Sequence, residues 1–129
     1  MSSFLIDTHV FLWWITGGEK LSKTARDCIT NPEHTIIVSA ISAWEISIKA
    51  RLGRLSEIGD PESSVTFHAQ RSGFSTQAFP FEAGLKVFHL PNHHSDPFDR
   101  ALIAHAKSLE VPIITADKLI SRYDVKTLW

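Results

Sequence analysis

The chain has 129 residues, of which 43% are hydrophobic and 21% are charged, a length and composition typical of a single globular domain, 1–129. Its formal net charge of −1 excludes a protein that binds nucleic acid through a strongly basic surface overall, so any such contact must come from a local patch. Cys28 is the only cysteine, which excludes an intrachain disulfide, and Asp7 interrupts the N-terminal apolar run where a signal peptide would continue it; both features favour a cytoplasmic location.

Short apolar runs alternate with stretches of helical periodicity through the first half of the chain. In order, we expect a strand at Phe4–Ile6, an apolar helix around Val10–Trp14, a Ser22-capped helix to about Thr30, a strand at Thr35–Val38 and a helix at Ala40–Arg51. The β-branched residues of the second strand favour an extended chain. Asn31 and Pro32 separate this strand from the helix before it.

The second half continues the same alternation. In order, we expect a helix from Asp60-Pro61 to about Arg71, a weaker strand at Phe74–Ala78, a short helix at Pro80–Phe88, a helix opened by Asp96-Pro97, a strand at Val111–Thr115, a short helix at Leu119-Ile120 and a strand at Val125–Leu128. Strands that are separated by helices pair in parallel, and helices then cover both faces of the sheet. The pattern therefore predicts an α/β fold, a three-layer α/β/α sandwich with a central, mostly parallel sheet.

Acidic residues lie where the predicted strands give way to helices. Asp7 follows the first strand, Asp117 follows the fourth, and Asp99 lies in the first turn of the helix that Asp96 opens. Glu45 lies within the mostly apolar helix after the second strand. In an open α/β sheet the carboxyl ends of the strands converge on one crevice. If the first, second and fourth strands are neighbours, these acids face one another.

Each of these acids also has a purely structural interpretation. Asp7, Asp96 and Asp117 suit helix N-caps. Asp99 suits a first helical turn, and Glu45 can pair with the lysine four residues on. Together, however, several carboxylates in one crevice cannot all stay ionised without a cation. Mg²⁺ and Mn²⁺ prefer such oxygen ligands, and they activate water for attack on phosphate esters, so the combination predicts metal-dependent phosphate-ester chemistry.

Several stretches of the chain, taken together, resemble the PIN-domain ribonucleases of the VapC toxin type. They are Leu5–Val10, Val38–Ile46, Leu90-Pro91 with His93-His94, Asp96–Arg100 running into Leu102–Ala104, and Ile114–Asp117. The resemblance covers nearly the whole chain. It implies a three-layer α/β/α fold, an endoribonuclease that hydrolyses RNA phosphodiester bonds with Mg²⁺ or Mn²⁺, and neutralisation by a small cognate antitoxin of the VapB type.

Carried over by position, the resemblance implies a catalytic acidic quartet consisting of Asp7, Glu45, Asp99 and Asp117. Asp7 and Asp99 are expected to bind the metal directly, whereas Glu45 and Asp117 complete the shell or hold metal-bound waters. Thr115 matches a hydroxyl position that supports the site. Asp96 is a further acid, which is either a nearby ligand or the helix cap.

Histidine and arginine residues near the acids leave other possibilities open. His89, His93 and His94, with Asp96, offer ligands for zinc. A simpler interpretation is that the two adjacent histidines hydrogen-bond within the loop that enters the acidic helix. Arg100 is a candidate contact for a phosphate group, or a partner for a carboxylate.

The positions of the tryptophans indicate which surfaces could bind RNA or a protein partner. Trp13, Trp14 and Trp44 lie in apolar stretches, so we expect them in the core rather than exposed for stacking on RNA bases. Apolar surface on the helix around Val10–Trp14, or on the helix from Asp60 to Arg71, would suit a homodimer or an antitoxin segment. No membrane partner is expected, because the uncharged stretch Thr8 to Gly18 is too short to span a bilayer.

Three other functions fit parts of the pattern. A phosphatase of the haloacid-dehalogenase type also uses a strand-end aspartate, but His9 stands where its second acid is needed. A phosphorylated receiver domain needs a lysine at a late strand end, where this chain has Asp117. A non-catalytic binding module would use the acids only as caps and ion pairs. Saturable Mn²⁺ binding that raises the melting temperature would distinguish the nuclease from this module.

Overall fold

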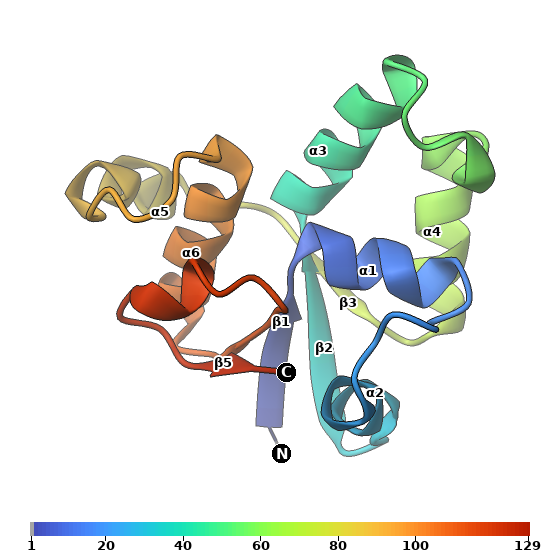
Figure 1. The fold of residues 1–129 in the computed structure, drawn as a ribbon, viewed down its shortest axis with the longest axis horizontal. Helices are drawn as coiled ribbons and strands as arrows, with labels where there is room; N and C mark the ends of the chain where they lie inside the picture. Colours follow the sequence, from blue (N-terminus) through green and yellow to red (C-terminus); the bar gives the residue numbers. More distant parts are fainter. Residues whose placement is uncertain (1) are drawn as a thin grey trace.

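A parallel β-sheet forms the centre of the computed structural model, which describes residues 2–129 (Figure 1). Its five strands are β1 (Ser2–Ile6), β2 (His34–Ser39), β3 (Ser75–Gln77), β4 (Ile113–Ile114) and β5 (Thr127–Leu128). They lie in the order β3-β2-β1-β4-β5, and every neighbouring pair is parallel. The first, second and fourth strands are therefore adjacent, which is the arrangement that the convergence of the acids requires.

Helices connect the strands. They are α1 (Thr8–Ile15), α2 (Lys23–Thr30), α3 (Ala40–Arg51), α4 (Pro61–Arg71), α5 (Phe81–Lys86) and α6 (Pro97–Leu109), with 3₁₀ helices η1 (Ser56–Ile58), η2 (Val87–His89) and η3 (Ile120–Arg122). The α-helices of eight or more residues begin with a side-chain cap, as expected of the residues Asp7, Ser22, Ser39, Asp60 and Asp96. No helix among residues 2–129 is long and apolar enough to cross a membrane.

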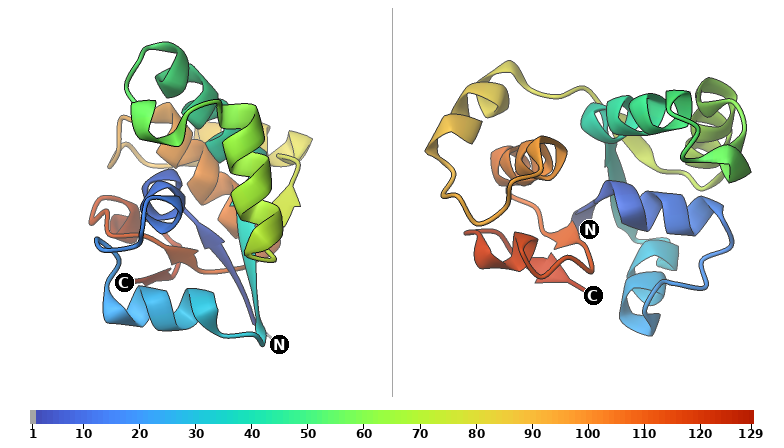
Figure 2. Two further views of the ribbon diagram at one scale, coloured as in Figure 1. Left: turned by 90° about the vertical axis from the view of Figure 1, so that its right-hand side faces the viewer. Right: turned by 45° about the horizontal axis from the view of Figure 1, so that its top comes forward.

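Alternate residues of the strands face two separate hydrophobic cores. Ile6 and Ile114 belong to the core that α1 and α2 cover, together with Ala69 of α4. Leu5 and Ile113 belong to the core that α6 and the residues around η3 cover. Figure 2 shows these helices on opposite sides of the sheet. The strands are thus buried on both faces, and the three-layer α/β/α prediction is confirmed.

The last two strands are shorter than the sequence predicts. Pairing in β4 is limited to Ile113 and Ile114, within the predicted strand Val111–Thr115. Pro112 precedes this pair and has no N–H to donate to a ladder, although its carbonyl accepts a hydrogen bond from the N–H of Leu5. β5 is correspondingly limited to two residues, since it pairs only with β4.

The C-cap of helix α6 is Glu110, which is the one non-glycine residue among residues 2–129 with a positive φ, 57°. A left-handed conformation costs an L-residue roughly 1–2 kcal/mol in the folded protein. Glycine adopts this conformation freely, but it also makes the unfolded chain more flexible, which offsets part of the gain in stability. Glu110→Gly is therefore expected to raise the free energy of unfolding by about 0.5–1 kcal/mol. Urea denaturation measures the change, and Glu110→Ala, which keeps the side-chain penalty, should give no comparable gain.

Candidate active site

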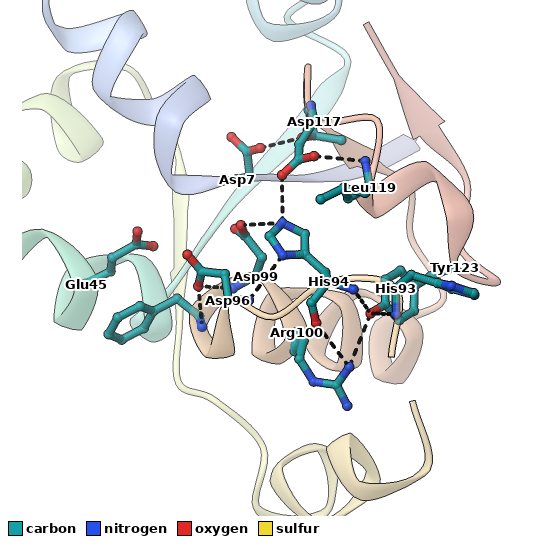
Figure 3. A network of polar contacts seen from close by, with 12 residues as sticks. Asp7, Glu45, His93, His94, Asp96, Asp99, Arg100, Asp117, Leu119 and Tyr123 are labelled. Carbon is teal, nitrogen blue, oxygen red and sulfur yellow. Dashed lines mark hydrogen bonds and ion pairs between the residues drawn. The ribbon is translucent and has the colours of Figure 1, made fainter. Parts of the chain in front are cut away.

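The carboxyl ends of adjacent strands bring the sequence-predicted acids to one edge of the sheet. Asp7 follows β1 and caps α1, while Asp117 lies three residues after β4. Glu45 comes from α3, which begins directly after β2, and Asp99 comes from the first turn of α6. Figure 3 shows Asp7, Asp99 and Asp117 around the ring of His94, with Glu45 directed towards them from α3.

Asp7 is buried and held at both carboxylate oxygens. Its Oδ1 accepts the N–H of Val10 at 2.8 Å, which is the helix cap. Its Oδ2 accepts the hydroxyl of Thr115 at 2.5 Å. That hydroxyl oxygen also accepts the N–H of Asp117 at 3.0 Å, so Thr115 joins two of the acids. Burial raises the pKa of the Asp7 carboxyl above its ordinary 3.8, and the charge of Asp117 adds to the effect.

His94 lies between two of the acids. Its Nε2 is 3.1 Å from Oδ2 of Asp99 and 2.8 Å from Oδ2 of Asp117. Its Nδ1 accepts the N–H of Asp96 at 3.1 Å, and this bond leaves the ring proton on Nε2, where it is shared between the two carboxylates. One ligand atom from each of His94, Asp99 and Asp117 lies within 4.8 Å of the others, close enough to hold a metal ion.

Asp99 is the most strongly perturbed carboxyl of the group. Its side chain is buried at the start of α6, and burial raises its pKa to about 7, with the negative charges of Asp96, Asp7 and Glu45 contributing. The neighbouring His94 acts in the opposite direction. These interactions show that the acids sense one another electrostatically, which a set of isolated caps would not do.

Glu45 is almost completely buried, with 1% of its surface exposed. Its Oε2 accepts a hydrogen bond from Nζ of Lys49 at 2.5 Å, so the predicted ion pair exists, but it is not on an exposed face. The other oxygen, Oε1, is buried and has no hydrogen-bond partner among residues 2–129. An unpaired buried carboxylate oxygen is costly, and a cation beside it would remove that cost.

Asp96 and the other histidines have structural contacts. Asp96 accepts the N–H groups of Phe98 and Asp99 at 2.8 and 3.1 Å, so it is the N-cap of α6. His93 packs against the ring of Tyr123, and His89 is exposed. The zinc alternative is therefore not supported: among residues 2–129, His94 is the only histidine grouped with acids as possible ligands. The prediction that this histidine hydrogen-bonds within the loop entering the helix is confirmed by the bond from the N–H of Asp96, whereas its contacts with Asp99 and Asp117 were not predicted.

Among residues 2–129, Arg100 makes its side-chain hydrogen bonds to backbone carbonyls and the Tyr123 hydroxyl rather than to a carboxylate, in contrast to the predicted pairing. Its guanidinium donates to the backbone carbonyls of Val87, Leu90 and Pro91 at 2.9–3.2 Å. It also donates to the hydroxyl of Tyr123, which accepts the backbone N–H of His94 at 2.8 Å. Arg100 therefore fixes the path of the loop that carries His94. The sequence holds no local signal for such a role, since the carbonyls belong to η2 and the loop after it, 9–13 residues before Arg100.

The prediction that Trp44 lies in the core is wrong. Its side chain is 59% exposed, whereas Trp13 and Trp14 are half-buried beside the core, as expected. Trp44 contacts Phe98 edge to face, with the ring centroids 5.1 Å apart. Ile48, one turn further along α3, is also exposed. The predicted helix at Ala40–Arg51 is confirmed, but the side of it that carries Trp44 and Ile48 is exposed.

The donors present fit a hard divalent cation. Most of the side chains in the site are carboxylates. Glu45 is buried and has an unpaired oxygen. Burial disfavours the ionised forms of Asp7 and Asp99. Mg²⁺ and Mn²⁺ favour carboxylate oxygens. Among residues 2–129, the ligand atoms close enough together to hold one ion are those of His94, Asp99 and Asp117. Asp7 and Glu45 lie near enough for their charges to act on Asp99.

Comparisons with known proteins agree with this fold. The family model of the PIN domain matches residues 4–126. A chain in the crystal structure of VapBC2 from Rickettsia felis, bound to a DNA fragment from their promoter, superposes with a TM-score of 0.72 at 13% identity, covering 97% of this chain and 96% of that one. A chain of DNA-bound VapBC from Salmonella typhimurium gives 0.70 at 15% identity, covering 98% and 97%.

A domain of a functionally unknown protein from Methanocaldococcus jannaschii DSM 2661 is also similar, with a TM-score of 0.59 at 19% identity, covering 98% of this chain and 89% of that one. A search of the curated proteins found no match. The structural similarities lie below 25% identity, so they concern the fold. The PIN domain match, in contrast, is a match of sequence and spans nearly all of the chain.

Proposed function

The chain belongs to the PIN domain family, and from this premise we propose that it is an endoribonuclease that hydrolyses RNA phosphodiester bonds with Mg²⁺ or Mn²⁺. The observation that carries the proposal is the unpaired Oε1 of buried Glu45, whose charge, like that of Asp7, acts on the buried Asp99 beside Asp117 and His94. Such a cluster destabilises the metal-free protein. A site that has this cost without a structural benefit is typical of function.

In the proposed site, each side chain has a distinct task. Asp7 and Asp99 hold the cation, and the hydroxyl of Thr115 fixes the orientation of Asp7. A bound divalent ion lowers the pKa of a water molecule and stabilises negative charge on the phosphate. Lys49 holds Oε2 of Glu45, so the unpaired Oε1 is the oxygen of this side chain that would face the bound ion or a water molecule that the ion holds.

Asp117 and His94 complete the arrangement from the other side. Asp117 is anchored at Oδ1 by the N–H of Leu119 at 2.9 Å, so its Oδ2 is directed to the site. The His94 ring keeps Asp99 and Asp117 close together, and its own loop is fixed through Tyr123. Asp117 would therefore complete the shell of the ion or hold a water bound to it, and His94 would orient the acids around the ion, as residues around a metal site usually do.

The biological setting that we propose is a toxin–antitoxin pair. The resemblance to VapC toxins implies a small antitoxin of the VapB type, and chains of two VapBC structures share this fold. A homodimer and a cytoplasmic location belong to the same proposal. Co-purification with the product of an adjacent short reading frame, followed by loss of ribonuclease activity in the complex, would test the pairing.

The metal requirement tests the nuclease directly. Purified protein should cleave an unstructured RNA with Mn²⁺ or Mg²⁺, lose this activity in EDTA, and regain it when the ion is returned. The melting temperature should rise with the ion, since a ligand at 100 times its Kd stabilises by about 2.7 kcal/mol. Absence of both effects would favour the non-catalytic binding module. Cleavage that persists in EDTA would contradict the metal mechanism.

A further inference from the structure

Trp44 and Phe98 form an aromatic pair beside the acids. Trp44 directly precedes Glu45 on α3, and Phe98 directly precedes Asp99 on α6. Their rings meet at 80° with centroids 5.1 Å apart. Phe98 is half-buried against the core, whereas the Trp44 side chain is 59% exposed. In an edge-to-face contact at least one face of the indole remains open.

We propose that Trp44 is a stacking site for an unpaired RNA base close to the bond that is cut. This inference rests on the proposed ribonuclease function and specifies its substrate as RNA that is single-stranded at this position. Base stacking on an exposed aromatic ring is a common means of binding unpaired RNA. Phe98 anchors the indole to the core, so the ring is held in place before RNA arrives.

The charges along α3 favour a nucleic acid over an apolar protein partner. After Glu45, the sequence to residue 55 carries Lys49, Arg51 and Arg54 and no acid. Lys49 is occupied by Glu45, but Arg51 and Arg54 are exposed. Arg51 is seven residues after Trp44, which places it on the same side of the helix, about 10 Å further along. A base on Trp44 would thus have a cation available for a neighbouring phosphate.

A competing occupant is a protein surface, because Ile48 and Leu52 are also exposed on α3 and its C-cap, at 38% and 64%. These two residues extend the apolar surface away from the acids. A protein interface would use them together with Trp44, whereas base stacking requires the ring alone. Leu52→Ala, at the C-cap of the same helix, is therefore a matched control, and Phe88→Ala is a control for an exposed aromatic residue outside the acidic site.

The test combines variants of the protein with RNA in which one nucleotide lacks its base. Binding of fluorescent, unstructured RNA is measured in EDTA at low salt, and cleavage is measured as kcat/KM with Mn²⁺. Trp44→Ala should weaken binding about tenfold or more, while Trp44→Phe should retain most of it. An abasic nucleotide is then moved along the RNA. At one position it should weaken wild-type binding to the same extent and have no further effect on Trp44→Ala.

The salt dependence gives an independent readout. Trp44→Ala should leave the slope of log affinity against log salt unchanged, because stacking releases no counterions, while Arg51→Gln should reduce the slope by about one. Unchanged RNA binding in Trp44→Ala, or an equal loss in Leu52→Ala together with an altered oligomeric state, would overturn the stacking site in favour of a protein interface. Wild-type protein that binds RNA without cutting it would contradict the proposed function and leave the stacking comparison fully measurable.

Discussion

Replacing Asp7 by asparagine is expected to lower RNA cleavage by at least about a hundredfold while the protein remains folded. Asparagine keeps the size of the side chain and is an equally good helix N-cap, so the bond from the N–H of Val10 can persist. It lacks the negative charge that holds a hard cation. Loss of a residue that merely orients a ligand costs about 10- to 100-fold, so loss of the ligand itself should cost more.

The stability of the same variant separates lost chemistry from lost folding. Burial raises the pKa of the Asp7 carboxyl, which means that its ionised form destabilises the folded, metal-free protein near neutral pH. The asparagine side chain carries no charge, so the metal-free melting temperature should be at least that of the wild type, and the rise caused by Mn²⁺ should be lost. Asp60→Asn replaces an exposed N-cap on α4 and should leave cleavage unchanged. Full cleavage by the Asp7→Asn variant would reject the site.

The positions of the acids in the fold could be predicted because they depend on local sequence features, the ends of strands and the starts of helices. Asp7 and Asp96 stand directly between an apolar or irregular segment and a helix, and both accept N–H bonds from that helix. The parallel sheet then follows from the alternation of strands and helices, and it brings the strand ends together. Glu45 has no capping role, because it lies far from the start of an apolar helix, but the sequence also allowed its ion pair with Lys49, which the structure contains.

The exposure of Trp44 could not be predicted, because α3 is apolar on several sides. Ile41 belongs to one core and Ile46 to the other, so two different faces of this helix are buried. Helical spacing then fits Trp44 as well as it fits the buried residues. Which face is left open depends on the angle at which α3 crosses the end of the sheet, and no local pattern encodes that angle.

The orientation of the His94 side chain also depends on contacts that no local sequence pattern encodes. The loop before α6 is fixed by Arg100, which donates to several carbonyls of residues 87–94, and by Tyr123 from the end of the chain. These contacts turn the His94 ring towards Asp99 and Asp117. A sequence interpretation could find the histidine and its loop, but not the distant residues that aim it.

Asp99→Asn is expected to reduce the pH dependence of metal binding near neutral pH and to remove most of the cleavage. The wild-type Asp99 carboxyl has a pKa raised to about 7, mainly by burial, so below that pH it carries a proton. A divalent ion binds the ionised form and must displace this proton. The apparent Mn²⁺ affinity of the wild type should therefore fall about tenfold for each pH unit below the pKa and level off above it. Calorimetric titration across the neutral range measures this slope.

The metal-free proteins should show the opposite trend in stability. Between the ordinary pKa of 3.8 and about 7, the folded state keeps the Asp99 proton while the unfolded chain has released it. The stability contributed by this proton is thus present at low pH and is lost as the pH rises through about 7. His105, whose pKa is lowered by burial, weakens folding in acid, but it is common to both proteins and cancels in their difference. The free energy of unfolding of the wild type minus that of Asp99→Asn should therefore decrease between these two pKa values and then stay constant. A difference that is flat across this range would show that Asp99 ionises as an ordinary surface carboxyl, and the crowded, cation-dependent site would lose its physical basis.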